Sequence, residues 1–221
     1  VSIAKEYPGH ARRVMSAVWG QGQMSFCKAV ALVDSNVDLK EPRRILTSIL
    51  DTLDLDTDLY QSEGILDVLD HSAPDPLFGG KLGIDATRRV PGEHERPAPA
   101  GRPVPLPSVE ALYQTAAEVS PLLTGAHAPD LAVKNRVLLL NLRKDGQETG
   151  HKLAEPLLNH PGFAPFSILV LCDETIDLRD GSLVLWKAFN NVDPKRDLIR
   201  GDGRMVVDAT RKGPEDGHLR E

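Results

Sequence analysis

The feature that most constrains the fold is an internal repeat. Asp34, Asp38, Asp54 and Asp58 each have another aspartate 139 residues later (173 − 34). Leucines at positions 32, 39, 46 and 59 recur at the same distance. The result is eight identities without a gap over residues 32–59, where average composition gives about two by chance. We therefore expect the chain to contain two copies of one folding unit.

A second repeated stretch shows how the two copies differ in length. The stretch "KLGIDATRRVPGE" from Lys81 returns as "RMVVDATRKGPED" from Arg204, at a distance of only 123 residues (208 − 85). The second copy has therefore lost sixteen residues (139 − 123) from the loop "DHSAPDPLFGG" that precedes this stretch, and loops tolerate such deletions. We predict a first unit at 1–95, a proline-rich linker plus a helix at 96–133, and a second, shortened unit at 134–221.

Hydrophobic periodicity predicts an α/β fold class for both units. Strand-like runs occupy 1–4, 28–34, 59–62 and 81–85, and helical spacing occupies 9–19 and 42–53, the latter entered through a proline. A further helix is predicted from 108. The connecting stretch "RPAPAGRPVPLP" holds five prolines, which favour extended conformations. We expect two similar units, each a sheet with flanking helices, joined by this linker and the helix.

The composition excludes several classes of protein. A net charge of −6 disfavours extensive nucleic-acid binding, and no apolar run approaches the roughly 20 residues of a membrane span. Cys27 and Cys172 form no CxxC motif, so we expect two core thiols in a reducing cytoplasm rather than a disulfide or a zinc site. Because the first residue is Val and the sequence opens in mid-strand, we expect a piece of a longer protein.

Two pairs of repeated polar residues are candidates for chemistry. Asp34 with Asp38, and Asp173 with Asp177, place two carboxylates four residues apart just past a strand, where α/β sheets often bind ligands, so a metal site or an acid–base pair is one interpretation. The other interpretation, which we favour, is that Asp34 and Asp173 brace their loops by accepting backbone N–H bonds. His10 and His151 follow a glycine at a helix start, and packing or helix-start hydrogen bonding is the favoured role for them.

The segment "FGGKLGIDAT" is the candidate ligand site of the first unit. Gly79 and Gly80 allow a close approach of the backbone to a ligand, and Lys81 could present a cation to a phosphate or a carboxylate. The alternative is an ordinary solvated lysine. His71 lies in the preceding loop and is a weaker candidate.

Three segments carry a resemblance to a known family. "KEYPGHARRVMSAVWG", "VDSNVDLKEPRRIL" and "LDVLDHSAPDPLFGGKLGIDATRRVPGE" resemble, in order and spacing, the C-terminal part of the UbiD family of decarboxylases. That family is typified by 3-polyprenyl-4-hydroxybenzoate carboxy-lyase of ubiquinone biosynthesis. The resemblance covers residues 1 to about 95. It departs from the family wording where "VDSNVD" replaces "VDDDVD" and "GGKLGIDAT" replaces "GSKMGIDAT", and the loss of acidic residues in the first of these argues against an acid-based role there.

The resemblance implies non-oxidative, reversible decarboxylation of aromatic or α,β-unsaturated acids. Such enzymes use prenylated FMN, held through a divalent metal (Mn or Mg) and K. Their catalytic Glu-Arg-Glu set and metal ligands lie upstream, so we expect this fragment alone to be inactive and to bind no cofactor. Lys81 resembles the family lysine that reaches toward the cofactor phosphate, with Gly79, Gly80 and His71 beside it. Arg204 keeps the charge in the second copy, which we expect to be a structural or interface unit.

The implied partners follow from the same resemblance. They are the upstream flavin-binding domain of the same chain, a flavin prenyltransferase and further copies in a homo-oligomer. The location would be cytoplasmic, with membrane association if the substrate is polyprenylated. The substrate stays open among a polyprenyl-hydroxybenzoate, a naphthoate of menaquinone biosynthesis and a simpler aromatic acid. The competing hypothesis is a non-catalytic α/β scaffold or interaction module derived from such an enzyme.

Overall fold

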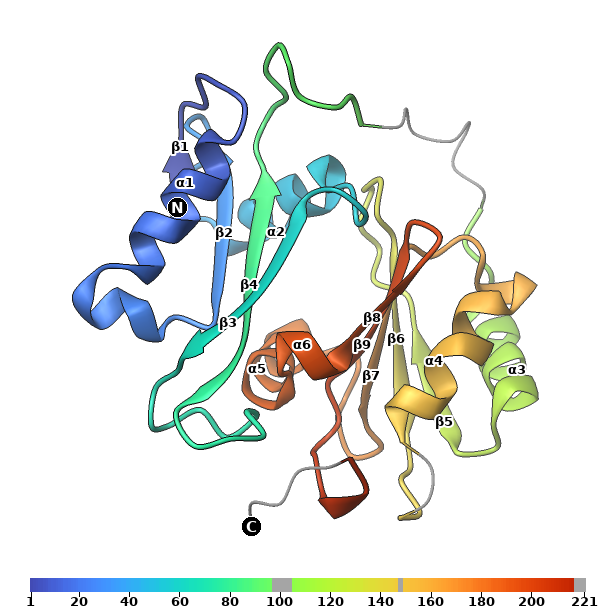
Figure 1. The fold of residues 1–221 in the computed structure, drawn as a ribbon. Coiled ribbons are helices and arrows are strands. Elements are labelled where there is room, and N and C mark those ends of the chain that lie inside the picture. Colours follow the sequence, from blue (N-terminus) through green and yellow to red (C-terminus); the bar gives the residue numbers. More distant parts are fainter. Residues whose placement is uncertain (97–104, 147–148, 217–221) are drawn as a thin grey trace.

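The computed structural model describes residues 1–96, 105–146 and 149–216 (Figure 1). Most of the predicted proline-rich linker, 97–104, lies outside the described residues. No helix in the described part of the chain is long and apolar enough to cross a membrane.

The first unit is a four-stranded sheet with helices on both faces. In chain order its elements are β1 (Ser2–Ile3), α1 (His10–Trp19), η1 (Gly22–Phe26), β2 (Ala29–Asp34), α2 (Pro42–Thr52), β3 (Leu59–Ile65) and β4 (Phe78–Ala86). The strand order is β1-β2-β4-β3, with β3 antiparallel to β4 and the other pairs parallel. Proline stands at the start of α2, as predicted, because the first helical turn needs no N–H from it.

The second unit repeats this arrangement and extends it. Its elements are β6 (Val137–Leu142), α4 (Gly150–Asn159), η2 (Pro161–Phe163), β7 (Ile168–Asp173), α5 (Gly181–Asn191), α6 (Pro194–Asp197), β8 (Leu198–Gly201), β9 (Arg204–Asp208) and η3 (Pro214–Asp216). Between the units lie the predicted helix, α3 (Val109–Val119), and a strand that we did not predict, β5 (Leu123–His127). The sequence of β5, "LTGAH", is short and carries a central glycine, so it lacks the usual strand signal.

The two sheets agree in strand order and in register. The second sheet has the order β5-β6-β7-β9-β8, which is the order of the first sheet with β5 added at one edge. Leu32 is paired with Asp85 in the first unit, and their counterparts Leu171 and Asp208 are paired in the second. The predicted α/β fold class is confirmed, and the matching register supports duplication.

Alternating side chains bury both faces of the central strands. In β7, Leu169 and Leu171 join the core under α3 and α4, while Ile168, Val170 and Cys172 face the opposite way. In the first unit, α1 covers the outer face of the sheet through the cluster that includes Met15 and Leu32. Figure 1 shows α1 on one outer side, α3 and α4 on the other, and α2 and α5 between the two sheets.

The units share one apolar core and meet in a reciprocal way. Leu50 and Leu53 of the first unit belong to the same cluster as residues of α5, β7 and β9. Gln61 donates to the carbonyl of Pro194 (2.6 Å), and its counterpart Arg200 donates to the carbonyl of Leu55 (3.4 Å), the counterpart of Pro194. Arg200 also donates to the side-chain oxygen of Gln61 (2.9 Å). These reciprocal contacts indicate an approximate two-fold relation between the units.

Candidate functional site

The repeated aspartates build a polar centre at the carboxyl edge of each sheet. In the first unit, Asp34 accepts the backbone N–H of Arg88 with both oxygens (3.2 and 3.1 Å). In the second unit, Asp173 accepts the N–H of Arg211 in the same way (3.0 and 3.2 Å). The prediction that these carboxylates brace loops is confirmed. Among the described residues, no group of three or more His, Cys, Asp or Glu side chains could hold a metal ion.

The repeated "DAT" motif closes each centre by local hydrogen bonds. Asp85 accepts from the N–H (3.1 Å) and the hydroxyl (2.5 Å) of Thr87. Asp208 accepts from the same two groups of Thr210 (3.1 and 2.6 Å). The alanine between them is buried in both copies. The motif is repeated because both folding units need the same strand exit.

A buried lysine neutralises the first centre. The ammonium of Lys5, whose side chain is 0% exposed, lies 2.8 Å from Asp85 Oδ2 and 2.8 Å from Glu93 Oε2. Burial alone would raise the pKa of Asp85, but hydrogen bonds from Lys5 and Thr87 outweigh it and hold that pKa below its ordinary value. The pKa of Glu93 is lowered in the same way, against a smaller effect of burial.

A second buried acid in this centre pairs with two arginines. Asp58, which is 3% exposed, lies 2.6 Å from Arg89 and 2.6 Å from Arg96, and it also accepts the backbone N–H of Asp54 (2.8 Å). A cavity of about 460 Å³ lies beside it, lined in part by Arg12 and Arg89. Cations thus engage Asp58, Asp85 and Glu93, which makes these acids a structural network.

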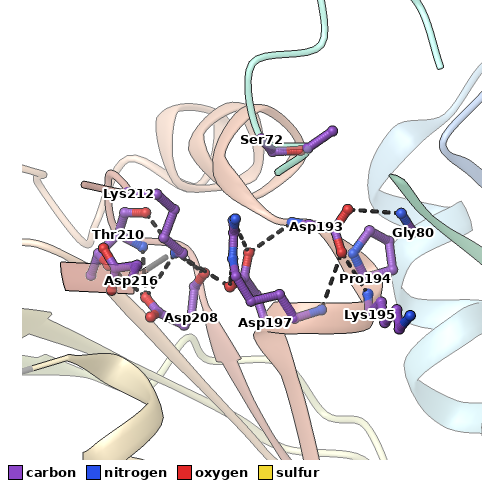
Figure 2. Close-up of polar contacts among 12 residues, drawn as sticks. Ser72, Gly80, Asp193, Pro194, Lys195, Asp197, Asp208, Thr210, Lys212 and Asp216 are labelled. Atoms are coloured by element: carbon purple, nitrogen blue, oxygen red, sulfur yellow. Dashed lines mark hydrogen bonds and ion pairs between the residues drawn. The ribbon is translucent and has the colours of Figure 1, made fainter. Parts of the chain in front are cut away.

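Figure 2 shows the corresponding centre of the second unit. Lys212 lies between Asp208 (3.2 Å) and Asp197 (3.8 Å), and Arg196 also pairs with Asp197 (2.7 Å). Burial raises the pKa of Asp197 even though Arg196 and Lys212 oppose the rise. Burial also disfavours ionised Asp208, but there Lys212 and Thr210 prevail and lower the pKa. The ion pair of Lys5 with Glu93 has its equivalent in the ion pair of Lys144 with Asp216 (2.6 Å).

Sequence reasoning missed the lysines and several of their partners. Lys5 and Lys144 are 139 residues apart, and Glu93 and Asp216 are 123 apart, which are the two distances already found in the repeat. The same offsets therefore contained the signal for both ion pairs. Arg96 could not have been found in this way, because the residue 123 positions later is Leu219, which carries no charge.

The predicted ligand lysine is engaged inside the first unit. Lys81 is 4% exposed, and its ammonium donates to the carbonyls of Ser25 (2.7 Å) and Cys27 (2.9 Å). It also lies 5.9 Å from the centre of the Trp19 ring. Burial lowers the pKa of this ammonium. These two carbonyls engage two of the three N–H donors of the ammonium, and a contact to a flavin phosphate stays a prediction.

Arg204 holds the corresponding turn of the second unit. Its guanidinium donates to the carbonyls of Phe166 (2.9 Å) and Phe163 (2.7 Å), and also to that of Leu158. Phe166 is the counterpart of Cys27, so each unit uses a cation on β4 or β9 to hold the turn before β2 or β7. This shared role accounts for the conserved charge at the two positions without a ligand.

The predicted glycine pair approaches protein rather than a ligand. The N–H of Gly80 donates to Asp193 Oδ2 (2.7 Å), as Figure 2 shows. A Cβ at Gly80 would lie 2.6 Å from the backbone nitrogen of Lys195, and one at Gly79 would lie 2.7 Å from Asp193. The N–H of Gly80 and the open side of both glycines therefore face Asp193 and α6, and the residues present do not form a phosphate site in this conformation. A smaller cavity of about 350 Å³ lies beside this contact.

The histidines are dispersed. His71 is exposed in the loop between β3 and β4. His10 stacks on Tyr7 with ring centres 4.4 Å apart, and its Nδ1 accepts the N–H of Glu6 (3.3 Å), so packing at the helix start is confirmed for it. His151 is exposed near the start of α4. The structure brings none of these three together with Lys81 in an interaction among the described residues.

The two cysteines should differ sharply in reactivity. Cys172 is fully buried, and burial together with the charges of Asp173 and Asp208 raises its pKa to about 12. Cys27 is only partly buried. With Ellman's reagent at pH 8 we expect one fast-reacting thiol per folded chain and a second only after denaturation, since the thiolate is the reactive form. The fast phase should vanish in Cys27→Ser, and two fast thiols in native protein would contradict the prediction.

Comparisons with known proteins place the chain in a family. The family model described as the 3-octaprenyl-4-hydroxybenzoate carboxy-lyase C-terminal domain matches residues 1–86 and 106–217. An uncharacterized protein of Helicobacter pylori is 32% identical over 226 residues, which cover 99% of this chain and 34% of that protein. An uncharacterized protein of Archaeoglobus fulgidus is 42% identical over 90 residues, covering 40% of this chain and 19% of that protein. The chain thus spans about a third or less of these relatives.

Two solved structures are similar to part of this chain. The UbiD-class enzyme HmfF from Pelotomaculum thermopropionicum, in complex with FMN, has a TM-score of 0.37 and 26% identity over 44% of this chain and 22% of its own. The vanillic acid decarboxylase of Sedimentibacter hydroxybenzoicus, in open form, has a TM-score of 0.42 and 24% identity over 53% of this chain and 26% of its own. Membership of the family rests on the family model.

Proposed function

Because the chain belongs to the family of 3-octaprenyl-4-hydroxybenzoate carboxy-lyase C-terminal domains, we propose that it is the C-terminal part of a non-oxidative decarboxylase of aromatic or unsaturated acids. The match of the family model to both units carries this proposal. The reaction would use prenylated FMN bound by an upstream domain, and the flavin would supply the electron sink. The site residues and the whole protein's substrate, including any role in quinone biosynthesis, belong to the proposal.

The described residues of the chain fit a supporting role. In the two polar centres their buried acids pair with cations or accept backbone N–H bonds, and their predicted phosphate contacts are engaged with backbone groups or with α6. We therefore assign to this part of the protein the tasks of covering one side of the active site and supporting oligomerisation. On its own it should neither decarboxylate a substrate nor retain the flavin.

The test uses the full-length protein, co-produced with a flavin prenyltransferase, and compares Lys81→Met with Arg204→Met. Flavin absorbance per folded protein and decarboxylation of a panel of aromatic acids are the two readouts. If Lys81 is a cofactor contact, its replacement lowers flavin occupancy and activity, whereas Arg204→Met affects only stability. If the two variants lose stability and retain flavin alike, both cations only hold their turns.

The rival function, a non-catalytic scaffold, has its own outcome in this experiment. Support for it comes from the second unit, which repeats the fold with a shortened loop and keeps the same internal ion network. Full-length wild-type protein that binds no flavin and decarboxylates none of the acids would favour the scaffold over the enzyme. Flavin binding with turnover of any acid in the panel would exclude it.

A further inference from the structure

The helices α2 and α5 occupy equivalent places in the two units but differ in exposure. The 139-residue offset pairs Leu46 with Leu185 and Leu50 with Phe189. Leu50 is 5% exposed and Leu46 is packed against the shared core, whereas Leu185 and Phe189 are 41% and 61% exposed. Trp186, on the same helix, is 57% exposed. The second unit therefore presents an aromatic helix face where the first unit has a covered one.

A segment just before β6 covers α2. Its apolar residues Leu131 and Val133 pack against the cluster that contains Leu50, and Figure 1 shows the chain running past the end of α2 before it enters β6. The side-chain amide of Asn135, which is 5% exposed, donates to the carbonyls of Leu50 (2.8 Å) and Leu53 (2.6 Å). The segment thus covers the helix and satisfies its last carbonyl groups.

The approximate two-fold relation between the units makes α5 the counterpart of α2. β1 is the counterpart of β6, because Ile3 is paired with Asp34 as Leu142 is paired with Asp173. Because the bonds of Gln61 and Arg200 are reciprocal, each unit contacts the other through the same face. By this relation, a segment leading into β1 would meet α5 as residues 131–135 meet α2.

We propose that the α5 face, formed by Leu185, Trp186 and Phe189, is the docking site of an extended polypeptide segment joined to the amino side of β1. The segment would carry two apolar residues two positions apart, as Leu131 and Val133 are, followed by a side-chain amide. That amide would donate to the carbonyls of Phe189 and Val192, the counterparts of those bonded by Asn135. The Helicobacter pylori relative, of which this chain covers 34%, is long enough to contain such a segment.

The probe is a capped peptide with the sequence of Asp130–Arg136, added to the 221-residue protein labelled with 5-fluorotryptophan. The chain has two tryptophans, so fluorine NMR separates Trp186 from Trp19. We expect a saturable shift of the Trp186 signal and an unchanged Trp19 signal. Phe189→Ser should weaken binding about tenfold or more, as loss of a central aromatic contact commonly does. Tyr113→Ser, at a site 48% exposed on α3, should leave it unchanged.

Three results would overturn the proposal. The first is a Trp186 signal that does not move up to the solubility limit of the peptide. The second is a signal that moves with protein concentration alone, together with a dimer in sedimentation that Trp186→Ser abolishes, because the occupant would then be a second copy. The third is equal binding by a peptide with serine at the places of Leu131 and Val133, which should fail to bind.

Discussion

Lys5→Met is expected to lower the free energy of unfolding by about 3–5 kcal/mol at pH 7, because it removes the cation from a buried pair and leaves two carboxylates uncompensated. The Lys5 side chain is 0% exposed, and those of Asp85 and Glu93 are 13% and 11% exposed. Water can therefore do little to solvate the two carboxylates once the charge of Lys5 is removed. Urea unfolding measures the change, and Lys40→Met, at an exposed site, should stay within about 0.5 kcal/mol of wild type.

The pH dependence of this variant should run opposite to that of wild type. In the native protein the pKa values of Asp85 and Glu93 are lowered, so their contribution to stability is present above the unfolded values of about 4 and is lost as pH falls through the folded ones. Without Lys5, burial still opposes ionisation of both carboxyls while the strongest bond that lowers their pKa is lost, so protonation relieves the folded state. We expect Lys5→Met to gain stability from pH 7 toward pH 5.

A neutral variant separates this explanation from simple loss of packing. Lys5→Met combined with Asp85→Asn and Glu93→Gln removes all three charges and should recover part of the lost stability at pH 7. A single Lys5→Met that costs less than about 1 kcal/mol, or that loses stability as pH falls from 7 to 5, would show that the pair is not buried in solution as the structure describes.

The sequence predicted those parts of the molecule that local chemistry and repetition determine. Asp34 and Asp173 could be assigned to loop bracing because aspartate after a strand commonly accepts backbone N–H groups. The fold class followed from the period of the apolar residues. In contrast, β5 lacked a strand signal because its central glycine and short length resemble a loop. Its place at the edge of β6 is decided by tertiary pairing.

The candidate site was harder to predict, because a sequence gives residue types without their partners. A lysine beside two glycines has the chemistry of a phosphate site, but Lys81 donates to two carbonyls of its own unit. Because Gly79 and Gly80 have no side chains, α6 can pack against β4, although α6 lies more than 110 residues further along the chain. Both outcomes depend on how the second unit and the turn before β2 pack, and neither is encoded in the local pattern.

Gly80→Ala is expected to destabilise the contact between the two units by about 3 kcal/mol. The added Cβ would lie 2.6 Å from the backbone nitrogen of Lys195 and 2.7 Å from Asp193 Oδ1, and neither position can yield without moving α6. The shift would also weaken the buried bond from the Gly80 N–H to Asp193 (2.7 Å). Urea unfolding should show a lower midpoint, and a second transition if the units separate before they unfold.

The matched control for this prediction is Gly181→Ala at the start of α5. A Cβ there meets no atom within 4 Å, so the change should be neutral or stabilising by up to about 1 kcal/mol through helix propensity. Equal midpoints for wild type and Gly80→Ala would mean that α6 does not press against β4 in solution. The glycine pair would then be free to approach a ligand, and its predicted role in cofactor binding would regain the support that the present packing denies it.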